Sequence, residues 1–123
     1  FDVVGDTLRG TKGIMLDMYR QPDLLKAACE KVVGIMAEYM ISSARAAGNH
    51  PIVFIPLHKG TAATRDGKGG LMSLGQFEEF YWPTLRKLML ILIENGLVPN
   101  LLIEGDYTGR NAGQSKGIRQ EAY

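Results

Sequence analysis

Two acidic residues separated by one glycine, Glu104 and Asp106, end the apolar run in the stretch LVPNLLIEGDYTGR at residues 97–110. Carboxylates one residue apart on a strand point the same way, and two charges that close raise the pKa of one group. Burying them unpaired costs free energy, so we expect a nearby cation such as Arg110 or a metal ion, or a general acid–base role. The alternative is that both acids cap the strand end and accept hydrogen bonds from loop N–H groups.

A histidine follows a second short apolar run: His58 comes directly after PIVFIPL at residues 51–57. If both runs are neighbouring strands, His58 lies beside Glu104. The pair could then ligate zinc through nitrogen and oxygen, although a site without a thiolate suits soft-metal chemistry less well. We therefore predict Glu104, Asp106 and His58 as catalytic residues, with Glu104 and His58 as candidate zinc ligands. A hydrogen-bonded loop histidine is the alternative for His58.

Basic residues cluster in the segment that follows His58. Lys59 and Arg65, together with Tyr107 and Arg110 after the second run, could bind a carboxylate or phosphate of a small-molecule substrate. The alternative is a solvated loop. The run GKGG at residues 67–70 lacks the spacing and the Lys-Ser/Thr ending of a phosphate-binding loop, so we reject that interpretation.

The elements that must hold these residues follow from apolar periodicity and from helix stop signals. Pro22 suits a first helical turn, apolar residues then recur at helical spacing, and Gly48 is a good C-terminal glycine. Ser73 and Gln76 fit a capping box at the start of a second helix, in which Pro83 should produce a kink or a split. In order, we expect a strand end at 1–4, a glycine-punctuated loop at 5–13, helices at 14–20 and 22–48, a strand at 51–57, a loop at 58–72, a helix at 73–96 and a strand at 98–103.

Helices of about 25 residues between the strands predict parallel pairing in an α/β fold. Both long strands are apolar throughout, which is typical of strands that are buried on both faces of a sheet. Two architectures fit this order, a section of a (β/α)₈ barrel and a small doubly wound sheet. In either, the ends of the strands carry the candidate residues to one edge.

Composition limits the function classes. The chain has 123 residues, enough for one small domain, and its net charge of +1 gives no electrostatic case for nucleic acid or an anionic membrane. The single cysteine, Cys29, lies in an apolar helical pattern and is expected to be buried, which makes a reducing, cytoplasmic location the default. No run approaches the ~18 apolar residues of a membrane span. The start at Phe1 shows no signal-peptide pattern, and we expect a piece of a longer protein.

Three stretches, in order, resemble the uroporphyrinogen decarboxylase superfamily: LRGTKGIMLDMYRQPD at 8–23, GLMSLGQFEEFYWP at 70–83 and LVPNLLIEGD at 97–106. The resemblance covers residues 1–110, and 111–123 form a polar tail. It implies a partial (β/α)₈ barrel whose catalytic mouth holds His58, Glu104 and Asp106. It also implies either corrinoid-linked methyl transfer, through a corrinoid protein as partner, or porphyrinogen decarboxylation. The Glu-Gly-Asp tip favours the methyltransferase branch.

Two departures from that superfamily bear on activity. About three of the eight strands of a barrel are present, and the substrate-binding segment with its arginines and catalytic aspartate is absent. The zinc-dependent members carry His-x-Cys-Gly where this chain has LIEG at 102–105. Exposed sheet edges recruit other chains, so we expect self-association by strand or helix exchange to complete the fold. A non-catalytic, self-associating module is the alternative function.

Overall fold

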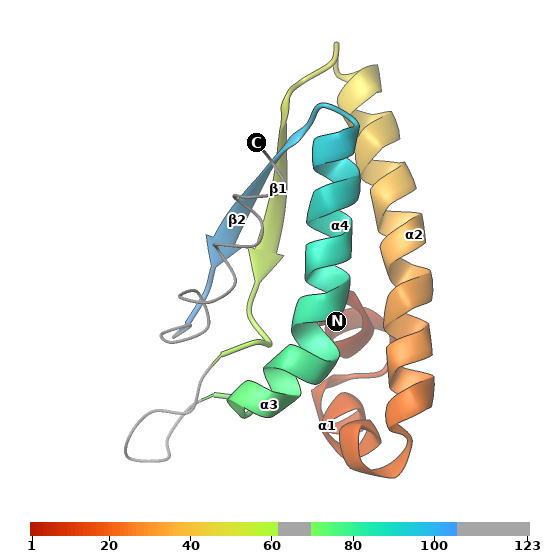
Figure 1. Ribbon diagram of the computed structural model, residues 1–123, viewed down its shortest axis with the longest axis vertical. Helices are drawn as coiled ribbons and strands as arrows, with labels where there is room; N and C mark the ends of the chain where they lie inside the picture. The colour runs from red at the N-terminus through yellow and green to blue at the C-terminus, as the bar shows by residue number, and fades with distance from the viewer. Residues whose placement is uncertain (62–69, 106–123) are drawn as a thin grey trace.

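The computed structural model describes residues 1–61 and 70–105, which form a parallel two-stranded sheet with helices packed on one face (Figure 1). This confirms the predicted α/β class and the parallel pairing. The elements run in the order η1 (Val4–Leu8), α1 (Thr11–Arg20), α2 (Pro22–Ala46), β1 (Ile52–Leu57), α3 (Leu74–Gln76), η2 (Phe77–Tyr81), α4 (Trp82–Glu94) and β2 (Val98–Ile103), where η denotes a π-helical turn.

Helix α2 follows the predicted signals at both ends. Pro22 occupies the first turn, where its missing N–H group costs nothing, and Asp23 lies beside it at the positive end of the helix dipole. Gly48, just beyond the last turn, has φ of 82°, which glycine adopts without strain. The buried stripe contains Leu25, Cys29, Val33, Ala37 and Ala44. Cys29 is buried as expected, and burial raises the pKa of its thiol.

The second helical region begins with the predicted capping box. The Gln76 N–H donates to Ser73 Oγ over 3.1 Å, and the Ser73 N–H donates to Gln76 Oε1 over 2.9 Å. Pro83 does interrupt the region: the turn before it, η2, is π-helical, with the Trp82 N–H bonded to the carbonyl of Phe77. A proline clashes with the turn that precedes it, and the widened turn accommodates that clash. Figure 1 shows α3 turning away from the axis of α4.

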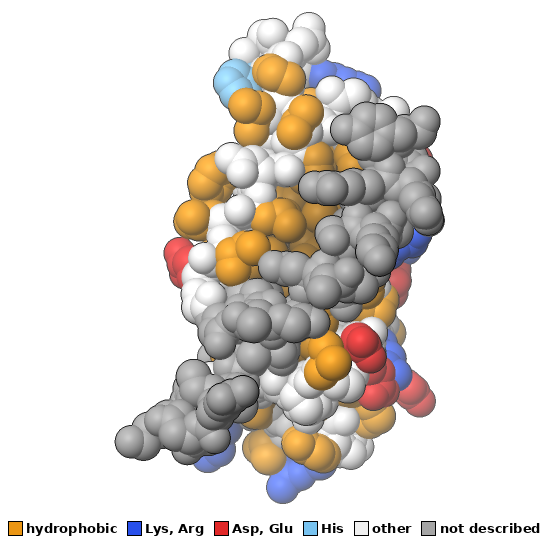
Figure 2. Space-filling view, turned by 60° about the vertical axis from the view of Figure 1, so that its left-hand side comes forward, with side chains coloured by type: hydrophobic (Ala, Val, Ile, Leu, Met, Phe, Trp, Pro, Cys, Tyr) orange, Lys and Arg blue, Asp and Glu red, His pale blue; other side chains and the backbone are white. Residues whose placement is uncertain are grey.

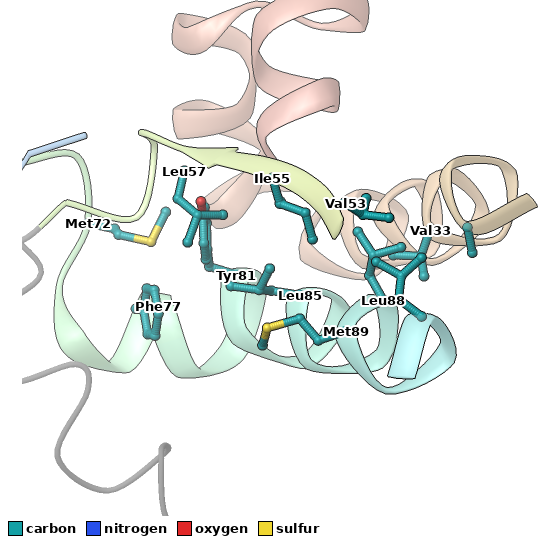
Figure 3. Packing of buried hydrophobic residues seen from close by; sticks show 12 residues of the cluster. Val33, Val53, Ile55, Leu57, Met72, Phe77, Tyr81, Leu85, Leu88 and Met89 are labelled. Carbon is teal, nitrogen blue, oxygen red and sulfur yellow. The ribbon is translucent and has the colours of Figure 1, made fainter. Parts of the chain in front are cut away.

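The two strands pair in parallel from Ile52↔Val98 to Leu57↔Ile103. Val53, Ile55 and Leu57 are buried and point toward α4 (Figure 3). The alternate residues face away from the helices, and Ile52 and Phe54 are 50% and 56% exposed. The prediction that both faces are buried is therefore wrong for the described residues. Successive side chains of a strand alternate between faces, and the helices cover only one of them.

The prediction of a strand end at Phe1–Val4 is also wrong. Asp2 and Val3 are helical and continue into the π-helical turn η1, where the Arg9 N–H donates to the Val4 carbonyl over 2.8 Å. The Phe1 ring lies 5.6 Å from the Tyr81 ring, and Val4 is buried. These contacts override the β propensity of the sequence FDVV.

The core lies between the inner face of the sheet and helices α2 and α4, and a second cluster joins α1, α2 and the N-terminal turn. The carboxyl ends of both strands lie at the same end of the molecule as α1 and α3 (Figure 1). This arrangement brings the N-terminal turn to the strand ends. Within residues 1–61 and 70–105, no helix has the length and apolarity needed to cross a membrane.

Candidate functional site

The carboxyl ends of the strands bring two of the predicted residues together. His58 follows β1 and Glu104 follows β2, and the Glu104 N–H donates to the Leu57 carbonyl over 2.9 Å. This backbone bond holds the His58 Nδ1 and Glu104 Oε2 atoms 3.5 Å apart. The other predicted residues, Asp106, Tyr107, Arg110 and Arg65, lie outside the described part of the chain.

The N-terminal turn adds two acids that the sequence analysis missed. Asp6 Oδ2 contacts His58 Nε2, and Asp6 Oδ1 lies 2.7 Å from Lys59 Nζ. Asp2 Oδ1 accepts the Lys59 backbone N–H over 2.9 Å, and Asp2 Oδ2 accepts the Tyr81 hydroxyl. The two acids are four residues apart and so lie on one side of a helical turn. The four-residue spacing of Asp2 and Asp6 can be read from the sequence FDVVGD, but a strand was predicted there, and a strand would not bring the two side chains together.

His58 lies between two carboxylates, and its bond to one of them, Asp6, favours the protonated ring. The hydrogen bond to Asp6 raises the pKa of His58 above 6.5, against a smaller lowering by burial. Burial raises the pKa of Asp6, but hydrogen bonds from Lys59 and His58 outweigh it and hold that pKa below 3.8. If His58 were neutral with its proton on Nε2, the Nδ1 lone pair would face the Glu104 carboxylate. The imidazolium form, which donates from both nitrogens, fits this arrangement.

Glu104 is more exposed than the sequence argument assumed, since its side chain is 57% exposed. The desolvation cost of a buried acid pair therefore does not apply to Glu104. Gly105 follows it with φ of 107°, and a Cβ there would lie 2.3 Å from Thr61 Cγ2. Glycine is required at this position because the segment after β1 passes against the end of β2. The Glu-Gly pair thus places an accessible carboxylate at a tightly packed strand end.

Lys59 was predicted to bind substrate, and the structure places its amine in an ion pair. Its side chain is 12% exposed, and its ammonium group contacts Asp6. The lysine stem passes over Gly5, where an added Cβ would lie 2.8 Å from Lys59 Cδ. The pairing positions Asp6 toward His58. Substrate binding by Lys59 stays a prediction.

A cavity of about 150 Å³ lies directly beneath this cluster. Its apolar wall comes from α2, β1 and α4, and includes Val33, Met36, Ile55 and Leu85. His58, Asp2, Asp6 and Thr7 supply polar groups from the strand end and the N-terminal turn. An apolar cavity with a few polar groups at one side is the usual form of a small-molecule site.

His58 and Glu104, the two candidate zinc ligands, meet part of the geometry that zinc requires. A separation of 3.5 Å between His58 Nδ1 and Glu104 Oε2 is compatible with two ligands on one tetrahedral ion. Asp6 on the other imidazole nitrogen matches the usual second partner of a metal-bound histidine. Catalytic zinc takes three protein ligands, however, and in the described part of the chain no three suitable side chains converge. The described residues alone therefore do not form a catalytic zinc site.

Comparisons with protein-family models, with curated proteins and with solved structures find no match to this chain. Two features of the structure bear on function. One is the cluster of Asp2, Asp6, His58, Lys59 and Glu104, which we call the His58 cluster, and the other is the cavity beneath it.

Proposed function

We propose that the His58 cluster is a general acid–base site acting on a small molecule bound in the cavity. The observation that carries this proposal is the imidazole of His58, bracketed by Asp6 and Glu104 and lining an apolar cavity. The bond to Asp6 raises the pKa of His58, which favours the protonated ring that can donate a proton.

In the proposed reaction, the proton on His58 Nδ1 passes to the substrate atom that gains negative charge. The product imidazole keeps its Nε2 proton, which stays hydrogen-bonded to Asp6. Asp6 therefore fixes the tautomer and the ring orientation, while Lys59 fixes Asp6. The exposed Glu104 can return a proton from water to Nδ1 and restore the imidazolium. Such proton transfer typically contributes a rate factor of about 10²–10⁴.

The resemblance to the uroporphyrinogen decarboxylase superfamily extends the proposal to a reaction class. We favour the methyltransferase branch of that superfamily, and in such a reaction His58 would protonate the substrate atom that loses its methyl group. A cavity of about 150 Å³ supports this choice, since cavities of that size hold one benzene-sized ring and a tetrapyrrole is several times larger. Uroporphyrinogen decarboxylation remains the alternative within the same superfamily.

We also propose that the two strands are neighbouring strands of a (β/α)₈ barrel over residues 1–110, completed by self-association. Parallel strands whose carboxyl ends carry the candidate residues support this, because barrel enzymes place their sites at that end. A methyltransferase of this superfamily would bring a corrinoid on a partner protein. Zinc at His58 and Glu104 is the alternative to a proton on His58 Nδ1, because that nitrogen cannot hold both. Zinc analysis of the purified protein tests the metal: protein that holds none and ignores added zinc excludes it.

The acid–base proposal is tested by methyl transfer to cob(I)alamin from a panel of small methyl ethers, methylthiols and methylamines. We expect one class to react, and His58→Gln to lower the rate about 10²–10⁴-fold. The matched control is Lys87→Gln. It removes an exposed ion pair with Glu30 that is not part of the His58 cluster, and it should leave the rate unchanged. Conversion of uroporphyrinogen instead, or full activity in His58→Gln, would contradict the proposal.

A second candidate function is a non-catalytic, self-associating module. The specific observation in its favour is the exposed apolar face of the sheet, on which Ile52, Phe54 and Val98 are each at least half exposed. A chain that assembles but reacts with neither substrate class would support this alternative.

A further inference from the structure

The face of the sheet that the helices leave uncovered is formed by six side chains. They are Ile52, Phe54 and Pro56, which alternate with buried residues along β1, and Val98, Asn100 and Leu102, which alternate along β2 with the half-buried Pro99 and Leu101. We call this set the outer sheet face. Phe54 and Val98 are each 56% exposed, and none of the six carries a charge. Figure 2 shows hydrophobic side chains gathered on this side of the molecule.

The edges of the sheet are poor templates for another strand. The Val98 N–H donates to the Pro51 carbonyl, and the Glu104 N–H donates to the Leu57 carbonyl. The backbone N–H and C=O groups of residues 51, 53, 55 and 57 therefore point toward β2. Residues 52, 54 and 56 point their backbone groups away from β2, and residues 99, 101 and 103 point theirs away from β1. Pro56 and Pro99 therefore each remove an N–H group from an edge that pairs with no further strand among residues 1–61 and 70–105, and the Ile52 N–H is directed at His50 Nδ1. Proline on an edge strand discourages strand addition.

We propose that a second copy of this chain covers the outer sheet face, packing face to face about a two-fold axis. A two-fold contact places a surface against itself, so a charged surface would repel its own copy. The outer sheet face has no charge, and the chain has a net charge of only +1. A partner chosen by charge has nothing to recognise there. Completion of a barrel would need strand pairing at the sheet edges, so face packing is a separate mode of self-association, and it is independent of the acid–base site.

A groove beside this face gives the second copy a place to anchor. It encloses about 290 Å³ between the C-terminal half of α2 and β1, and Ile52 and Phe54 belong both to it and to the outer sheet face. Tyr39 and Met40 form its opposite wall. Aromatic side chains in such grooves supply much of the binding free energy of interfaces. The Phe54 ring of the second copy is the side chain placed to enter it.

Sedimentation equilibrium of the 123-residue chain tests the proposal. We expect a dimer at tens of micromolar and a dissociation constant at least about 100-fold weaker in Phe54→Lys, because the two-fold axis brings the new charges together. The matched control, Ile35→Lys, adds the same charge at a 60% exposed position of α2 and should leave the dimer intact. A wild-type chain that stays monomeric, or a Phe54→Lys variant that dimerises as well as wild type, would overturn the proposal.

Two further variants separate face packing from strand pairing and guard against misfolding of Phe54→Lys. Pro99→Ala restores an edge N–H without altering the outer sheet face; face packing predicts an unchanged dissociation constant, and tightening of about 10-fold would show edge pairing instead. Asn100→Cys places a thiol on the outer sheet face and should form a disulfide between copies on mild oxidation, since the native Cys29 is 1% exposed. Failure to cross-link in a folded dimer would also overturn the proposal.

Discussion

Two carboxylates of the N-terminal segment, Asp17 and Asp6, are paired with cationic side chains, and these partners differ in one decisive respect. Asp17 receives two hydrogen bonds from Arg9, of 2.7 and 3.0 Å, and one of 2.8 Å from Gln21. Asp6 forms ion pairs with Lys59 and His58. Hydrogen bonds to cations lower the pKa of both acids, with Arg9 the main cause at Asp17. Arginine keeps its proton at every ordinary pH, whereas histidine titrates near neutrality.

This difference separates a structural pair from a candidate site. The Arg9–Asp17 pair fixes the N-terminal turn against α1 and has a single protonation state near neutral pH. The Asp6–His58 pair can exist in two protonation states, because histidine can release its proton, and the pair lines a cavity. The carboxylate alone does not distinguish the two clusters. The partner's ability to release a proton, and an adjacent space for a substrate, are what mark the His58 cluster.

The largest expected effect comes from Gly5→Ala. A Cβ at this position would lie 2.6 Å from Ile14 Cδ1 and 2.8 Å from Lys59 Cδ. Overpacking of this kind costs about 1–3 kcal/mol and should displace Lys59 from Asp6. Urea denaturation measures the loss. The matched control is Gly34→Ala in α2, where no atom lies within 4 Å of the added Cβ; it should stabilise by about 0.5–1 kcal/mol. Equal responses would contradict the close packing around Lys59.

Tyr81→Phe should have the next largest effect. It removes the hydroxyl that donates to Asp2, and the loss of a hydrogen bond to a charged group costs about 1–2 kcal/mol. Thermal unfolding followed by circular dichroism measures the change. Tyr39→Phe is the control, since Tyr39 is 73% exposed. If both variants unfolded at the same temperature, Asp2 would have no part in positioning the cluster.

The Asp6–His58 pair should make stability depend on pH in a specific window. Because the pKa of His58 is raised on folding, its contribution is fully present below pH 6.5 and is lost as pH rises through the folded pKa. The pair is partly exposed, so the contribution should be about 1 kcal/mol or less. Unfolding free energies of wild type and His58→Gln, measured from pH 5.5 to 9, should therefore converge at the upper end. A gap that widens with pH would contradict this sign.

The Arg9–Asp17 pair should show no such dependence. The pKa of Asp17 is lowered on folding, so its contribution is present above pH 3.8 and is lost only as pH falls through the folded value. The difference in unfolding free energy between wild type and Arg9→Met should therefore be the same at pH 6 and pH 9. A change across that range would remove the contrast between the two clusters.

Local signals in the sequence predicted most of the helices and strands. Pro22, Gly48 and the Ser73 capping box each act within a few residues, and the parallel pairing followed from the length of the connections. The burial of both sheet faces was predicted wrongly because Ile52 and Phe54 are as apolar as Val53 and Ile55. Residue type does not show which face the helices cover.

The candidate site could be predicted only in part, for a related reason. His58 and Glu104 were found because both directly follow strands. Asp2 and Asp6 were missed because FDVV has β propensity, and its helical form depends on contacts with Tyr81, which is about 80 residues away. The pairing of Asp6 with His58 joins positions 52 residues apart, which no local pattern reveals.

The central claim is that Asp6 holds His58 as a proton donor, and an NMR titration of the His58 imidazole tests it most directly. We predict that His58 titrates above pH 6.5 in the wild-type chain, that its neutral form carries the proton on Nε2, and that Asp6→Asn lowers its pKa. A His58 that titrates at or below pH 6.5, with no response to Asp6→Asn, would contradict the account.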